Sequence, residues 1–162
     1  MKFSFAVAAL SALLMTAAFS VVADNDKTSA RAILGASPFA HLKYGVNVVK
    51  GRAELSPKND GANTQVVVKI RGLTPGTTHI GHIHGGTCAA LQPGTIFHNL
   101  EPVVINEAGQ GISKTVIPES MDGLIDCEWW VAVHEGPENA TPQTPAVAVG
   151  PVITRGKAKS DD

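Results

Sequence analysis

Short runs of alternating apolar and polar residues, separated by turn residues, constrain the fold of this chain more than any other feature. In residues 65–71, Val66, Val68 and Ile70 fall on one face of an extended strand, and Val67 is the one apolar residue on the other. The same reasoning predicts a histidine-bearing strand after residue 76 and further strands over residues 46–55, 102–106, 112–117, 129–134 and 146–153. Beyond the first 22 residues no segment shows a convincing helical period, so the sequence predicts an all-β sandwich or barrel.

The N-terminal segment has the features of an export signal. A short basic start precedes an almost wholly apolar run over residues 3–22, and Val21-Val22-Ala23 matches the small-x-Ala pattern before a cleavage point. The alternative is a retained membrane anchor, since the run approaches the roughly 20 residues that a span needs. The cleavage pattern and the polar residues after it favour a signal peptide over residues 1–23. We therefore expect a periplasmic or secreted protein with no stable membrane insertion after cleavage.

The rest of the chain is long enough for one domain. We expect a flexible lead over residues 24–38, a β domain over residues 39–154 and a disordered charged tail over residues 155–162. The net charge is −1 and the sequence shows no basic stripe, so nucleic acid is not an expected partner.

Histidines are concentrated in one predicted strand. His82 and His84 are two residues apart, so their imidazoles lie on one face of a strand and can begin a metal site. His98 and His134 are the candidates to complete it, and His134 ends an apolar strand where a polar residue needs a reason. Imidazole suits copper, zinc, iron and nickel. No acidic residue lies close to His82 or His84 in the sequence, so a site of the calcium type is not expected.

The two cysteines, Cys88 and Cys127, allow only one intramolecular pairing. Export would place them where disulfides form and persist. A bridge would close a loop of about 40 residues and stabilise the fold by roughly 3–4 kcal/mol in the chain-entropy model. The alternative is two free thiols that bind metal. We favour the disulfide.

The segment around these histidines resembles a known metal-binding sequence. Gly-Leu-Thr-Pro-Gly at residues 72–76, followed by His79, His82 and His84, is similar to the copper-binding segment of the Cu,Zn superoxide dismutases. A cysteine follows shortly afterwards in that family, as Cys88 does here.

The resemblance extends over residues 46–153. That family carries a further histidine about fifteen residues beyond the His-x-His pair, and His98 lies in a comparable place. Val-His-Glu at residues 133–135 and the strand at residues 148–153 are also similar to family segments. The resemblance implies a Greek-key β-sandwich or barrel of the superoxide dismutase-like type.

The resemblance also implies roles for five histidines. His82, His84 and His134 would be copper ligands, and His98 would be the ligand that bridges copper to zinc in the two-metal enzymes. His79 matches a structural histidine that forms hydrogen bonds with backbone near the site and supports the ligands from outside.

Three departures from the family pattern limit what the resemblance implies. The zinc-binding histidines and aspartate that follow the bridging ligand are missing, so one copper ion is expected and zinc is not. The family's active-site arginine falls at Ala146, which weakens electrostatic steering of a small anion. Val149 stands where the family has its second cysteine, so Cys127 would pair with Cys88 from a different strand.

The chain also resembles the chordin-type (CHRD) domain, a relative with the same sandwich. The His-Ile-His-Gly-Gly run at residues 82–86, the Gly-Pro-Val-Ile strand at residues 150–153 and the short loop within residues 93–104 are similar to that domain. This resemblance implies metal binding or a scaffold rather than catalysis.

Three hypotheses about function follow. The first is a copper-only superoxide dismutase-like enzyme, an oxidoreductase acting on superoxide, in which no catalytic residue is assigned beyond the metal ligands. The second is a non-catalytic copper-binding protein for periplasmic storage, delivery or tolerance, whose partner donates or accepts copper. The third is a metal-free structural domain of the chordin type.

Overall fold

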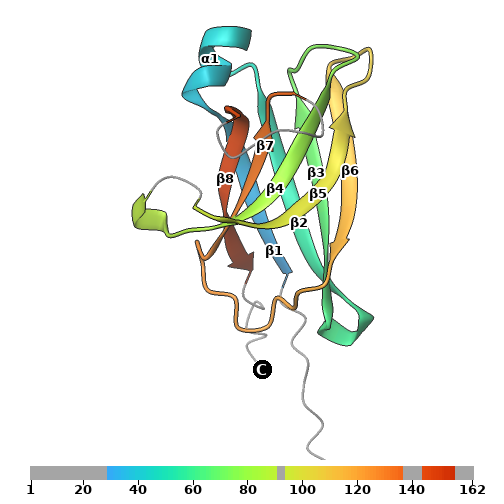
Figure 1. The fold of residues 1–162 in the computed structure, drawn as a ribbon, viewed down its shortest axis with the longest axis vertical. Coiled ribbons are helices and arrows are strands. Elements are labelled where there is room, and N and C mark those ends of the chain that lie inside the picture. The colour runs from blue at the N-terminus through green and yellow to red at the C-terminus, as the bar shows by residue number, and fades with distance from the viewer. Residues whose placement is uncertain (1–28, 91–93, 137–143, 156–162) are drawn as a thin grey trace, which may run out of the picture.

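The computed structural model describes residues 29–90, 94–136 and 144–155. Eight strands form the framework of this part of the chain and contain more than half of its residues (Figure 1). They are β1 (Ser29–Ala36), β2 (Lys50–Lys58), β3 (Asn63–Arg71), β4 (Thr78–Gly85), β5 (Ile96–Val104), β6 (Gln110–Ile117), β7 (Trp129–His134) and β8 (Ala146–Arg155). One short helix, α1 (Pro38–Tyr44), and two 3₁₀ turns, η1 (Asn59–Gly61) and η2 (Cys88–Ala90), complete the described elements.

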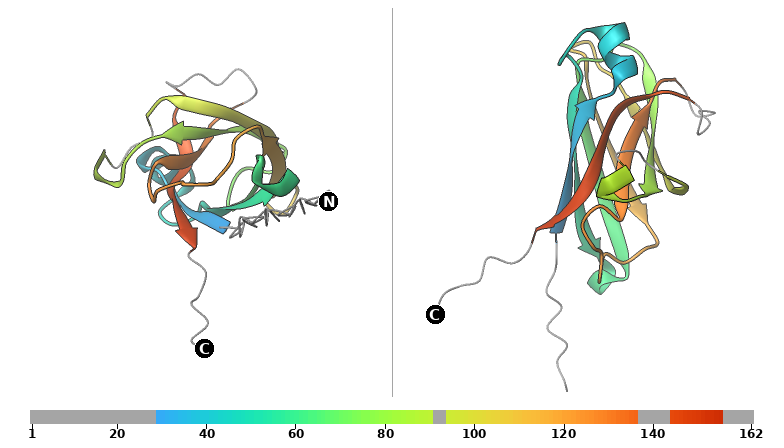
Figure 2. Two further views of the ribbon diagram at one scale, coloured as in Figure 1. Left: turned by 90° about the horizontal axis from the view of Figure 1, so that it is seen from below. Right: turned by 90° about the vertical axis from the view of Figure 1, so that its left-hand side faces the viewer.

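The strands form one antiparallel sheet that curls into a nearly closed barrel, as the view along the strands shows (Figure 2). The strand order is β5-β4-β7-β8-β1-β2-β3-β6. β7 pairs with β4 although β5 and β6 lie between them in sequence, which is a Greek-key connection. The open seam lies between β5 and β6, where the Glu101 amide donates a hydrogen bond to Thr115 Oγ1 at 2.8 Å. The predicted all-β class is confirmed.

The core fills the barrel with alternate residues of the strands. Val66, Val68 and Ile70 of β3 are buried as their spacing predicts. Ile83 of β4 and Val131 of β7 are fully buried in the same cluster. The sequence neighbours of Ile83 on β4 and of Val131 on β7 therefore point to the outer face of the barrel wall.

The first described strand lies within the predicted flexible lead, and that prediction is wrong over residues 29–36. β1 pairs with β8 on one side and β2 on the other, so the barrel begins at Ser29 rather than at residue 39. Ala30, Ala32 and Leu34 alternate inward, but alanine and glycine are weak strand formers, which hid the pattern. Residues 1–28, with the predicted signal, and 156–162, most of the predicted tail, lie outside the described residues.

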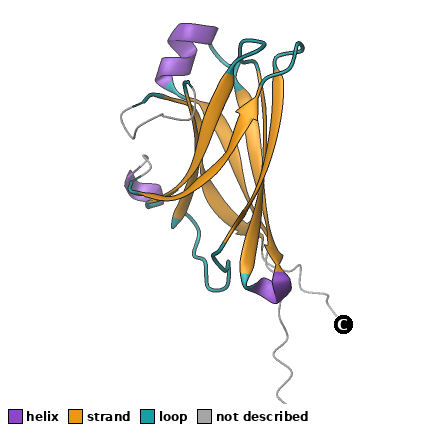
Figure 3. Ribbon diagram, turned by 45° about the vertical axis from the view of Figure 1, so that its right-hand side comes forward, coloured by secondary structure: helices purple, strands orange, loops and turns teal. Residues whose placement is uncertain are grey.

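A short helix follows β1 at one end of the barrel (Figure 3), and only its first residue, Pro38, lies in the predicted lead. Ser37 caps α1 by accepting a hydrogen bond from the Ala40 amide at 3.0 Å, and Pro38 takes the first position, where a missing N–H costs nothing. None of the helices in the described ranges is long and apolar enough to cross a membrane.

Candidate metal centre

Three histidines meet on the outer face of the wall formed by β4 and β7. His82 and His84 share a face of β4, as predicted from their spacing, and His134 ends the neighbouring β7. One nitrogen from each ring lies within 4.8 Å of the others. The ring centroids are 4.8 Å apart for His82 and His134, 5.5 Å for His82 and His84, and 5.7 Å for His84 and His134. We call these three residues the histidine triad.

The histidine triad is buried although it lies outside the barrel core. The residue exposures are 2% for His82, 3% for His84 and 3% for His134. The Nδ1–H of His84 donates to the carbonyl oxygen of Gly94 at 2.9 Å, and that of His134 donates to Thr144 at 2.7 Å. These hydrogen bonds hold Gly94, after β4, against the His84 ring and Thr144, after β7, against the His134 ring.

Among the described residues, each ring has one buried nitrogen without a hydrogen-bond partner. These buried atoms are Nδ1 of His82, Nε2 of His84 and Nε2 of His134. A carbonyl oxygen only accepts, so the bonds from His84 and His134 fix the proton on Nδ1 and leave the Nε2 lone pair available. Three buried imidazole nitrogens without hydrogen bonds are costly unless a ligand satisfies them, and a metal ion does so. The donor set therefore fits a metal that prefers nitrogen.

The surroundings keep the two β4 histidines in the form that binds metal. Burial, reinforced by repulsion from His134 and then His84, lowers the pKa of His82 to about 4. Burial also lowers the pKa of His84, although its bond to Gly94 opposes this. Both rings are therefore neutral near pH 7, as ligands must be.

His79 supports the triad from the other side of the backbone. It is fully buried, and its Nδ1–H donates to the carbonyl oxygen of His134 at 2.9 Å. Its Nε2 lies 2.8 Å from Thr77 Oγ1. This is the contact with backbone near the site that its resemblance to a structural histidine implies.

The structure does not bring His98 to the triad, which corrects its assignment as a ligand. His98 lies within β5 rather than in a loop, directly opposite Ile83. Opposite residues share a face, so His98 points to the face away from His82 and His84. Its Nε2 lies 3.8 Å from Glu119 Oε2, and its ring lies 6.3 Å from that of Trp129. In the described residues the only cluster of histidine, cysteine or acidic residues suited to a metal is the triad.

A contact that the sequence reasoning missed joins α1 to the residue after His134. Lys43 and Tyr44 both donate to the carboxylate of Glu135, the tyrosine hydroxyl at 2.8 Å. Burial would raise the pKa of Glu135, but these bonds and the charge of Lys43 outweigh it and hold the pKa below its usual value. No local pattern signals this contact, because about 90 residues separate the partners.

Cys88 and Cys127 form the predicted disulfide, with 5.1 Å between their Cα atoms. The alternative of two metal-binding thiols is therefore excluded. Next to the bridge, the Gly86 amide donates to the carbonyl oxygen of Glu128 at 3.0 Å. Together these links tie the segment after His84 to the start of β7, the strand that carries His134.

Trp130 adds a polar group beside the triad. It lies opposite His84 on the neighbouring strand, and its buried indole N–H has no hydrogen-bond partner within residues 29–90, 94–136 and 144–155. Trp129 points the other way and packs in the core.

No known family model matches this chain, and no curated protein matches its sequence.

Proposed function

We propose that the protein is an exported copper-binding protein of the superoxide dismutase-like type, which holds one copper ion between His82, His84 and His134. The observation that carries this proposal is the convergence of three histidines whose rings each have one buried nitrogen without a hydrogen-bond partner in the described part of the chain. The donor set is all nitrogen with no carboxylate, which disfavours calcium and magnesium. Among divalent first-row ions, copper binds nitrogen sites most tightly. No zinc site is proposed.

The reaction that we propose for this centre is dismutation of superoxide. A copper ion held by His82, His84 and His134 would supply one-electron redox chemistry, by which two superoxide ions and two protons would give dioxygen and hydrogen peroxide. The protein would hold neutral imidazoles around the ion, and the fixed Nδ1 protons of His84 and His134 would keep their ligand nitrogens in place.

Copper storage or delivery without catalysis is the second candidate, and two observations favour it. All three ligand side chains are almost completely buried, which restricts access of a small anion. Ala146, at the place of the family's arginine, lies directly opposite His134 in the sheet and offers no positive charge. A partner that donates or accepts copper would then load the site.

A copper titration of the apo-protein, followed by the Cu(II) electron paramagnetic resonance spectrum and a dismutation assay, separates the candidates. We expect one equivalent of copper and a nitrogen-rich signal, both lost in His134→Ala and unchanged in the control His41→Ala, at a half-buried position of α1 outside the triad. A dismutation rate above that of a copper–histidine complex supports the enzyme, and a rate at that background supports the carrier. Absence of specific copper binding would refute both and leave a metal-free scaffold of the chordin type.

A further inference from the structure

Positive charge is concentrated on one half of the barrel. The adjacent strands β1, β2, β3 and β6 contain seven lysines and arginines but a single carboxylate, Glu54. The cations are Arg31, Lys50, Arg52, Lys58, Lys69, Arg71 and Lys114. The net charge of the chain is −1, so the rest of the molecule carries the compensating negative charge. The barrel is therefore electrostatically polarised.

Four of these cations form a compact group. The register of β2 and β3 places Lys50 opposite Arg71 and Arg52 opposite Lys69. We call these four residues the basic face. Like charges directly opposite each other destabilise a sheet, so this arrangement does not serve folding.

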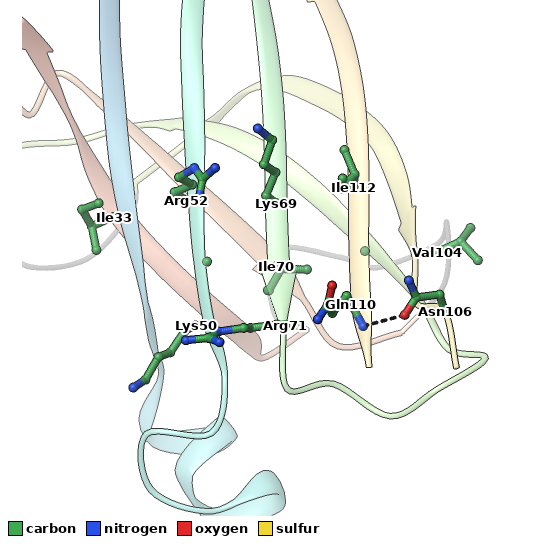
Figure 4. A pocket seen from close by; sticks show the side chains of 12 residues that line it. Ile33, Lys50, Arg52, Lys69, Ile70, Arg71, Val104, Asn106, Gln110 and Ile112 are labelled. Atoms are coloured by element: carbon green, nitrogen blue, oxygen red, sulfur yellow. Dashed lines mark hydrogen bonds between the residues drawn. The ribbon is translucent and has the colours of Figure 1, made fainter. Parts of the chain in front are cut away.

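The single carboxylate, Glu54, pairs with only two of the four cations of the basic face. Glu54 accepts from Arg52 Nε at 2.8 Å and from Lys69 Nζ at 3.3 Å. In the described residues no carboxylate forms an ion pair with Lys50 or Arg71. These two side chains project together into solvent (Figure 4).

The basic face borders a hollow of about 690 Å³ with apolar ends. Ile33 lies beside Arg52, and Ile112 lies beside Lys69, so a lateral row runs from one isoleucine through two cations to the other (Figure 4). The isoleucines are 59% and 66% exposed, so both side chains are available to contact an apolar partner.

The basic face lies on the wall of the barrel opposite the metal centre. Two strands, β8 and β1, separate β7 from β2, and two others, β5 and β6, separate β4 from β3. A partner on the basic face would leave the histidine triad uncovered.

We propose that the basic face docks on the anionic headgroups of a lipid bilayer. The cations would attract headgroup phosphates into the hollow, and Ile33 and Ile112 would enter the boundary between headgroups and acyl chains. A second copy of the chain is disfavoured because the face would meet its own positive charge. Nucleic acid is disfavoured because β1, β2, β3 and β6 contain no aromatic side chain for base stacking. This docking is surface binding, not insertion, and does not depend on copper.

Sedimentation with vesicles tests the proposal. We expect the chain to bind vesicles of equal parts phosphatidylglycerol and phosphatidylcholine, with binding that falls as salt rises, and not to bind pure phosphatidylcholine. Lys50→Gln/Arg71→Gln should weaken binding about 30-fold. Lys58→Gln/Arg155→Gln removes the same charge outside the hollow and should have a much smaller effect. All variants keep the same N-terminus, so its contribution cancels, and unchanged copper binding checks their fold.

A third double variant distinguishes lipid from other anions. Ile33→Ser/Ile112→Ser should weaken vesicle binding about 10-fold and leave any binding of polyphosphate or an oligonucleotide unchanged. Equal binding to pure phosphatidylcholine, no vesicle binding, or tight binding of a soluble polyanion without vesicle binding would each overturn the proposal. Equal losses in the hollow variant and its charge-matched control would overturn it as well.

Discussion

The Nδ1–H of His79 donates a hydrogen bond to the backbone carbonyl oxygen of His134, and the two atoms are 2.9 Å apart. This bond joins a fully buried ring on β4 to the backbone of the last residue of β7. His134 is a proposed copper ligand, and the bond fixes the backbone position from which its side chain extends. A non-ligand histidine thus positions a ligand through the main chain.

Replacement of His79 should weaken copper binding without abolishing it. We expect His79→Ala to lower copper affinity by about 10–100-fold while the stoichiometry stays at one ion, because the three ligand nitrogens remain but lose a support. His79→Gln, which keeps a donor, should recover part of the loss. Competition titration against a copper chelator measures both. An affinity unchanged in the alanine variant would contradict the positioning role.

Replacement of His98 should leave copper binding unchanged. Its ring faces away from His82 and His84 and lies near Glu119 and Trp129. We expect His98→Ala to bind one copper ion with the affinity and paramagnetic resonance spectrum of the wild type. A change in the nitrogen pattern of that spectrum would show that the β5 strand rearranges to supply a fourth ligand.

The parts of the fold that follow local patterning could be predicted from the sequence. Val66, Val68 and Ile70 alternate with more polar neighbours, and their burial follows from the geometry of a strand. The shared face of His82 and His84 follows from the same period. Strand β1 escaped prediction because its inward residues are mostly small, and its stability comes from pairing with β2 and β8.

The remaining features depend on register and long-range contacts, which local patterns do not encode. His98 faces away from the triad because the register of β4 and β5 places it opposite Ile83 rather than opposite His82 or His84. The basic face exists only because β2 and β3 align Lys50 with Arg71. The sequence shows no basic stripe, since these two cations are 21 positions apart in it.

The stability of the apo-protein should fall as the pH is lowered from about 6.5 toward 4. Burial lowers the pKa of His82 from 6.5 to about 4, so in this window the unfolded chain binds a proton that the folded chain does not. Stability therefore rises with pH here, by up to about 3 kcal/mol in total. His84, whose pKa is also lowered by burial, adds to the same trend. Urea unfolding at a series of pH values measures the slope.

The variant His82→Gln isolates this effect. It should flatten most of the dependence between pH 6.5 and 4 in the apo-protein. Loss of stability at lower pH should persist, because Glu135 and Glu54 have lowered pKa values and contribute stability that is lost as they become protonated. An unchanged slope in the variant would show that His82 is not the group that titrates.

The contact between α1 and Glu135 should stabilise the segment after His134. The carboxylate of Glu135 accepts from both Lys43 and Tyr44, and it is only about one-fifth exposed. We expect Glu135→Gln to lower the free energy of unfolding by about 1 kcal/mol, discounted for the exposure of Lys43. Tyr44→Phe removes one of the two bonds and should cost less. Equal stability of all three proteins in urea would contradict the contact.

The disulfide should contribute to stability and to the metal centre together. Cys88 and Cys127 are 39 positions apart, and closing a loop of that length stabilises the fold by about 4 kcal/mol in the chain-entropy model. We expect Cys88→Ser/Cys127→Ser to lose most of this contribution to the free energy of unfolding, measured in urea. The double variant leaves no free thiol that could bind copper. The segment after His84 would lose its tie to β7, so copper affinity should also fall. Wild-type protein treated with a reductant should unfold at about the same urea concentration as the double variant. A variant that unfolds at the wild-type urea concentration and binds copper as tightly would show that the hydrogen bond from Gly86 to Glu128 holds this segment without the bridge.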